Sequence, residues 1–201
     1  MTTSVLGVSA ASPRARVRGV AEALPPGERV LWEGAPQPRA LTRHLLFIRP
    51  IAAYFAVMVA WWIAAQPASV TGVAFWGPLA SQVALVGLVL LGARGLGVWI
   101  ASATTYAITD RRLVMRIGVV FPITVNIPLA YVQGAQLRTF ADGTGQIAVQ
   151  LDPKEKLAWV VLFPHVRSWR IGRPEPLLRG LGDPAAVGAI LRRATLGETE
   201  A

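Results

Sequence analysis

The sequence TTYAITDRRLVMRIGVVFPITVNIPL, which runs from Thr104 to Leu129, marks an abrupt change of pattern. Between positions 50 and 109 the only charged residue is Arg94, whereas an Asp-Arg-Arg triplet begins at Asp110. After the triplet, apolar and polar residues alternate, which is typical of β-strands with one buried face. The stretch therefore predicts that a segment suited to lipid passes directly into a β-rich domain.

Composition favours a membrane segment joined to a soluble part. The 201-residue chain is 53% hydrophobic, only 15% charged and has a formal net charge of +9. Soluble domains usually contain about a quarter charged residues, and here the shortage is concentrated in one region. Cysteine is absent, which excludes a disulfide scaffold, a Cys-based zinc site and thiol catalysis. The arginines are scattered, so we expect them to set membrane topology and meet anionic headgroups rather than bind nucleic acid.

Two apolar stretches predict a transmembrane hairpin at residues 45–66 and 79–102, joined by a turn rich in proline and glycine. The intervening turn has no charge, whereas arginines flank the hairpin on its other side: Arg39, Arg43, Arg49, Arg111 and Arg112. The positive-inside rule then predicts that both termini are cytoplasmic. The alternative is a hairpin buried in a soluble core, but the rest of the chain is too small to cover it.

Arg94 is the exception within the second stretch. An arginine near a helix end can extend its side chain to the headgroups, and the alternative is an ion pair with a partner helix. Gly87 and Gly92 lie on the same stretch, and with Arg94 they form our candidate helix-contact surface.

The soluble part has the pattern of consecutive antiparallel strands. Alternating runs cover residues 112–117, 121–129, 146–151 and 157–163, and turns are predicted at 142–145 and 152–155. Prolines in the second run predict an edge or bent strand. Asp183 and Pro184 predict the start of a C-terminal helix with an apolar stripe. The fold class is therefore α+β: a membrane hairpin and a small antiparallel β-barrel, or a sandwich, capped by a helix.

These patterns divide the chain into five segments. They are a disordered cytoplasmic tail (1–23), a segment before the membrane that joins the soluble domain (24–44), the hairpin (45–102), the cytoplasmic domain (103–196) and a short tail (197–201).

Three motifs carry a resemblance to known proteins. GERVLWEGAPQPR (Gly27–Arg39) precedes the hairpin and YAITDRRLVMRIG (Tyr106–Gly118) follows it, an order that resembles the bacterial pleckstrin-homology-like membrane proteins. FPHVRSWRIGRPEPLLRGL (Phe163–Leu181), with the whole layout, is similar to the PuhB-like photosynthetic-complex assembly proteins of purple bacteria. The resemblance implies a pleckstrin-homology-like barrel in the bacterial cytoplasmic (intracytoplasmic) membrane. It also implies a role in assembling the reaction centre with its core light-harvesting antenna.

The candidate partner surface combines an irregular segment with the Asp-Arg-Arg turn: Trp169, Arg170, Arg173, Glu175, Arg111 and Arg112. Prolines exclude regular helix at 174–176, and Trp and Arg are enriched in binding hot spots. The alternative is a loop that packs Trp169 over the barrel and arginines that meet solvent or headgroups. The expected partners are reaction-centre subunits, the core antenna and membrane lipids, with a homodimer left open.

We expect no enzyme and no cofactor. The chain has neither a glycine-rich phosphate loop nor histidines at metal spacing, and His44 and His165 are its only histidines. Imidazole can ligate the metal of bacteriochlorophyll or haem, but we expect His44 to be an interfacial or solvated histidine, and His165, which follows Pro164 at a strand end, is the weaker candidate ligand. Two alternatives to the assembly role remain: a lipid-surface or stress-related binding module, and a structural subunit that stays in the mature complex.

Overall fold

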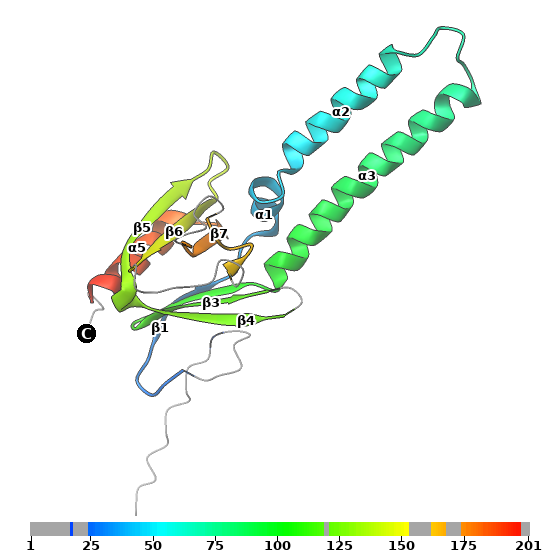
Figure 1. Ribbon diagram of the computed structural model, residues 1–201. Coiled ribbons are helices and arrows are strands. Elements are labelled where there is room, and N and C mark those ends of the chain that lie inside the picture. The colour runs from blue at the N-terminus through cyan, green and yellow to red at the C-terminus, as the bar shows by residue number, and fades with distance from the viewer. Residues whose placement is uncertain (1–16, 18–23, 119–120, 153–161, 168–173, 198–201) are drawn as a thin grey trace, which may run out of the picture.

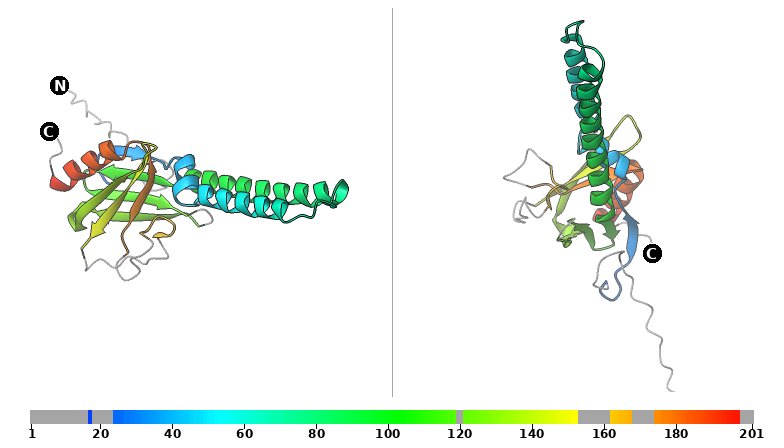
Figure 2. Two further views of the ribbon diagram at one scale, coloured as in Figure 1. Left: turned by 90° about the horizontal axis from the view of Figure 1, so that it is seen from above. Right: turned by 90° about the vertical axis from the view of Figure 1, so that its right-hand side faces the viewer.

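A helical hairpin projects from a domain of two antiparallel sheets (Figures 1 and 2). The computed structural model describes residues 17, 24–118, 121–152, 162–167 and 174–197. The helices are α1 (Pro38–His44), α2 (Ile48–Ala64), α3 (Val73–Ser102) and α5 (Pro184–Leu196). One sheet has the order β1 (Val30–Gly34), β2 (Thr105–Thr109), β3 (Arg112–Ile117) and β4 (Ile123–Pro128). The other has the order β5 (Val132–Thr139), β6 (Gly145–Leu151) and β7 (Leu177–Leu181).

The hairpin consists of α2 and α3, which lie side by side along their length (Figure 1). Among the described helices, α3 alone is long and apolar enough to cross a membrane. The helices α1 and α2 are long and apolar enough only when they are taken together, and this pair is bent by 54°. The bend lies at Phe47, whose φ of 50° is left-handed. The second helix of the hairpin, α3, begins at Val73 and not at 79 as predicted, and it contains Pro78 as its sixth residue.

The first sheet follows the alternation in the sequence on its core face, whereas Val114 on the other face of β3 is buried too, contrary to the prediction of one buried face. Leu113, Met115 and Ile117 of β3 are buried in the core between the sheets, and β4 is the edge strand, as its prolines predict. The segment before the hairpin, predicted to join the domain, is β1 and pairs with β2. The hairpin between β5 and β6 turns at Asp142 and Gly143, as predicted.

The predicted closed barrel is wrong for the described residues, whose strands form two separate sheets. Pro128 ends β4 without an N–H to donate, and a short 3-10 turn at Leu129–Tyr131 then redirects the chain into β5. The two sheets enclose one core, which α5 covers through Val187, Leu191 and Ala194. The helix begins as predicted, because the Asp183 Oδ1 accepts a hydrogen bond from the Ala186 N–H at 2.9 Å.

Two strands were missed from the sequence, β5 and β7. The run of residues predicted to form a strand at 157–163 lies largely outside the described residues, and its last two positions, Leu162 and Phe163, are not in a strand.

The short helix α1 connects the hairpin to the domain. Leu41 packs with Ile100 and Ala101 near the end of α3, and the Gln37 N–H donates to the carbonyl oxygen of Gly180 in β7 at 2.8 Å. The close approach of α1 and α3 occurs at Gly97, where a Cβ would collide with the Thr42 hydroxyl. Gly87 and Gly92 face open space instead. They make no close approach within this chain, and their contact with another helix stays a prediction.

We predict that Gly97→Ala lowers the free energy of unfolding by about 1–3 kcal/mol, the usual cost of overpacking. The new methyl group would displace the Thr42 side chain, whose hydroxyl donates to the Pro38 carbonyl oxygen at 2.8 Å. Chemical unfolding in detergent measures the change. The matched controls Gly87→Ala and Gly92→Ala have room for the methyl group and should be neutral or slightly stabilising. Equal effects at all three positions would contradict this packing of α1 on α3.

Candidate functional site

The turn between β2 and β3 is tied to the segment before β1. The Arg112 guanidinium donates to both carboxylate oxygens of Glu28, at 2.8 and 2.7 Å, and Glu28 is buried. Hydrogen bonding to Arg112 holds the pKa of the Glu28 carboxyl below its usual value. The Thr109 hydroxyl oxygen accepts from the N–H groups of Arg111 and Arg112. Arg112 therefore has a structural role in this turn, whereas Arg111 is exposed.

The predicted partner surface is divided by the structure. Trp169, Arg170 and Arg173 lie outside the described residues. Glu175 is buried and forms an ion pair with Arg167 at 3.0 Å, so its carboxylate has a structural role. A binding role for this surface stays a prediction.

A buried polar cluster joins the end of α3 to both sheets, and sequence reasoning missed it. His165 is fully buried; its Nδ1 lies 2.6 Å from the Tyr106 hydroxyl and its Nε2 lies 3.2 Å from the Thr104 hydroxyl. The Thr104 hydroxyl donates to the Ile100 carbonyl oxygen in the last turn of α3, so it accepts from His165 Nε2–H. The Arg179 N–H donates to the Tyr106 oxygen, which leaves the phenolic hydrogen for His165 Nδ1. These donors and acceptors assign His165 as the neutral Nε2–H tautomer.

The electrostatics of this cluster agree with a neutral histidine. Burial, and secondly the charge of Arg179, lowers the pKa of His165 to about 3. Burial also raises the pKa of the Tyr106 phenol. The Arg179 side chain donates to the carbonyl oxygens of Pro164 and Val166, which holds the chain on either side of His165. Both ring nitrogens of His165 are thus engaged within the chain, and pigment ligation would require breaking this network.

His44 lies at the end of α1 against the β5–β6 turn. Its ring stacks on Phe140 at a centroid distance of 3.7 Å, and its Nε2 lies 3.0 Å from Asp142 Oδ2. Arg43 donates to the same oxygen at 2.6 Å. Hydrogen bonds from Thr144, and then from His44, hold the pKa of the Asp142 carboxyl well below its usual range. In the part of the chain that the structure describes, no group of three or more histidine, aspartate or glutamate residues is arranged to hold a metal ion.

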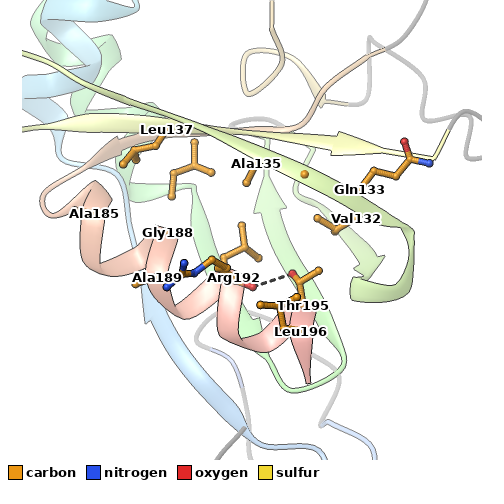
Figure 3. Close-up of a pocket in the computed structure, with 13 residues that line it drawn as sticks. Val132, Gln133, Ala135, Leu137, Ala185, Gly188, Ala189, Arg192, Thr195 and Leu196 are labelled. Carbon is orange, nitrogen blue, oxygen red and sulfur yellow. Dashed lines mark hydrogen bonds between the residues drawn. The ribbon is translucent and has the colours of Figure 1, made fainter. Parts of the chain in front are cut away.

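An apolar pocket of about 530 Å³ separates α5 from β5 (Figure 3). Side chains of β5, such as Leu137 and Val132, face those of α5, such as Ala189 and Leu196, across it. Among the described residues that line the pocket, Arg192 at its edge is the one that carries a charge, and none is a carboxylate or a histidine. This lining offers apolar contact and no acid–base pair. One side of the pocket is formed by β5, a strand that the sequence pattern did not predict.

A second pocket, of about 230 Å³, lies at the base of the hairpin, and we call it the basic pocket. Its lining comes from α1, the start of α2 and the last third of α3: Pro38, Arg39, Thr42, Arg43, Ile48, Arg49, Arg94 and Val98. The sequence predicted that Arg94 reaches toward headgroups or pairs with a partner helix. The structure brings it together with three further arginines of this chain, a convergence that no local pattern signalled.

We predict that the chain loses stability as the pH falls from 6.5 to 5.0 because of His165. The folded state keeps this histidine neutral, with its pKa near 3, while the unfolded state protonates below about 6.5. Stability from this residue is therefore complete above pH 6.5 and falls by about 1.4 kcal/mol per pH unit below it, or about 2 kcal/mol over the window. Unfolding of the wild type and of His165→Gln at both pH values measures the difference. An equal pH dependence in the two proteins would contradict the neutral buried histidine.

Two comparisons with known proteins found a match for this chain, and a third found none. The model of the bacterial PH domain family matches residues 44–155, more than half of the chain. The chain is 29% identical over 187 residues to an uncharacterized 23.7 kDa protein in the puhA 5' region of Rhodobacter capsulatus. This similarity covers 88% of the present chain and 83% of the relative. No solved structure matches the chain significantly. The chain belongs to the bacterial PH domain family.

Proposed function

We propose that this protein is a membrane-anchored assembly factor for the photosynthetic reaction centre and its core antenna. The observation that carries the proposal is the similarity to the relative in the puhA 5' region, a photosynthesis gene region. That similarity covers 88% of the chain and extends well beyond the residues that match the family model. It therefore supports a shared role for the whole layout and not only a shared domain.

In this proposal the hairpin spans the membrane twice, with both termini in the cytoplasm. The 30 residues of α3 measure about 45 Å, more than the ~30 Å of hydrocarbon. The outward faces of both helices expose large apolar side chains that water would not favour: Tyr54, Val57, Trp61, Val83, Leu88 and Leu91. Trp61 and Trp76 lie near the uncharged turn and Trp99 lies at the other end, as expected for the two interfaces.

The architecture suggests how such a protein acts. The exposed hairpin offers an apolar surface to newly inserted helices, and the open space over Gly87 and Gly92 permits close approach of another helix. In this proposal the domain, which is held at the base of the hairpin, contacts the cytoplasmic faces of the same subunits. A transient partner needs modest affinity, which suits an incomplete and partly polar interface.

The topology predicts the reactivity of single cysteines, since the chain has none of its own. Ser69→Cys lies in the turn between α2 and α3, and Ala185→Cys lies exposed on α5. In intact cells, a membrane-impermeant maleimide that enters the periplasm should label Ser69→Cys and spare Ala185→Cys. Inside-out vesicles should give the opposite result. Labelling of both residues from the same side would exclude the two-span arrangement.

The assembly role predicts which proteins accompany the tagged chain when it is isolated from mildly solubilised phototrophic membranes. Mass spectrometry should recover reaction-centre subunits in substoichiometric amounts, with little antenna. Gly92→Leu should lower this recovery several-fold by filling the proposed contact surface. Gly77→Leu, which also faces open space but lies at the turn end of α3, is the matched control.

The other outcomes of this experiment decide between the alternatives. Stoichiometric recovery with the mature complex would identify a structural subunit. Recovery of lipid or unrelated proteins alone would contradict the assembly role and favour a general membrane-surface module.

A further inference from the structure

The basic pocket at the base of the hairpin has the chemistry of an anion site. Three of its arginines, Arg39, Arg49 and Arg94, are exposed, and within the described ranges none of them forms a hydrogen bond or ion pair. The fourth, Arg43, is half-buried and already bound to Asp142. Three uncompensated guanidinium groups therefore line one pocket, and each raises the electrostatic cost of leaving the other two without a counter-ion.

The carboxylate that pairs with Arg43, that of Asp142, does not neutralise this charge. Asp142 accepts hydrogen bonds from Arg43, His44 and Thr144, so its oxygens are already shared among three groups. In the part of the chain that the structure describes, Arg39, Arg49 and Arg94 form no ion pair, so their guanidinium groups are available to an external anion. Guanidinium groups bind phosphate oxygens well, because their planar N–H donors match the spacing of those oxygens.

The position of the basic pocket along the membrane normal indicates that the phosphate belongs to a lipid headgroup. Counted from Val73, about 20 residues of α3 cross the hydrocarbon and reach Gly92. Arg94 follows two positions later, and Arg49 lies in the first turn of α2 at the same end of the hairpin. In the proposed membrane placement, both arginines therefore lie at the level where headgroup phosphates begin.

The size and lining of the pocket agree with a headgroup. Its volume of about 230 Å³ is below the ~300–1,000 Å³ of pockets that enclose drug-sized ligands, so it suits a small polar group. Ile48 and Val98 add apolar surface beside the arginines. A phospholipid would place its phosphodiester among the guanidinium groups and keep its acyl chains in the hydrocarbon along α2 and α3.

We propose that Arg39, Arg49 and Arg94 form a specific site for the phosphodiester of an anionic phospholipid at the cytoplasmic base of the hairpin. This inference rests on the membrane placement in the proposed function and not on the assembly role. Phosphatidylglycerol is the expected class of ligand. Phosphatidylcholine carries the same phosphodiester but adds a trimethylammonium group that the arginines repel.

Native mass spectrometry of the full-length chain in detergent, titrated with phosphatidylglycerol or phosphatidylcholine, tests the site. The wild type should retain phosphatidylglycerol more tightly. Arg94→Gln should weaken its binding about fivefold and the double variant Arg39→Gln/Arg49→Gln about 25-fold, from the typical contribution of one basic residue at an anionic surface. Arg193→Gln and Arg192→Gln/Arg193→Gln remove the same charges from α5, on the far side of the domain from the hairpin (Figure 1), and should change binding less than twofold.

Further measurements distinguish a lipid phosphate from inorganic phosphate. They also distinguish failure of this inference from failure of the proposed membrane placement. Inorganic phosphate at millimolar concentration should not displace the lipid; displacement at equal affinity would overturn the lipid as ligand. Phosphatidylglycerol binding that the pocket variants and the α5 variants reduce equally would overturn the site. In vesicles, a chain that resists carbonate extraction yet shows no preference for phosphatidylglycerol overturns this inference alone. A chain that carbonate extracts contradicts both the inference and the proposed membrane placement.

Discussion

The buried hydrogen bonds of His165 determine how the hairpin meets the domain. The chain passes from α3 to β2 through Ala103 and Thr104 alone, so no flexible linker separates the apolar helix from the sheet. Thr104 joins the last turn of α3 to His165, and Tyr106 on β2 joins His165 to Arg179 on β7. One neutral imidazole thus connects the helix end to a strand of each sheet. An apolar side chain at position 165 would leave the Tyr106 and Thr104 hydroxyls with one partner fewer inside the protein, which costs more than the hydrogen bonds contribute.

Features that depend on local sequence were predicted well. The alternation in β3 and β6 marks the face that packs on the core, although Val114 and Ala148 on the other faces are buried as well. The start of α5 is encoded by the adjacent residues Asp183 and Pro184. By contrast, β5 is mostly exposed and contains a bulge near Gly134, so its apolar positions do not alternate cleanly. The short β7 buries both Leu177 and Leu178, a pattern without period two. Closure of a barrel depends on pairing between distant strands, which no local run of residues reveals.

The His165 cluster and the basic pocket could not be predicted from the sequence, because each brings together residues that are distant along the chain. His165 lies 59 residues from Tyr106 in the sequence and 61 from Thr104, and nothing near it signals burial. Arg39, Arg49 and Arg94 each fit the positive-inside pattern, which depends on counts alone. Their convergence requires the left-handed residue Phe47, which turns α1 away from the axis of α2 and brings it against α3. A count of arginines predicts orientation, whereas the fold determines which of them share one pocket.

If the hairpin spans the membrane as proposed, the junction between α1, α3 and the His165 cluster would constrain one motion of the protein and the basic pocket another. Packing of α1 on α3 at Gly97, with the His165 cluster, fixes the angle between hairpin and domain. It leaves the depth of the hairpin free, because apolar helices tolerate displacement along the membrane normal at modest cost. A phosphodiester held by Arg49 and Arg94 would fix that depth, since the headgroup layer has a defined position. In the proposed assembly role, a domain held in both angle and depth would present the same surface to each new membrane subunit, and a short-lived, weak partner needs this in order to be selective.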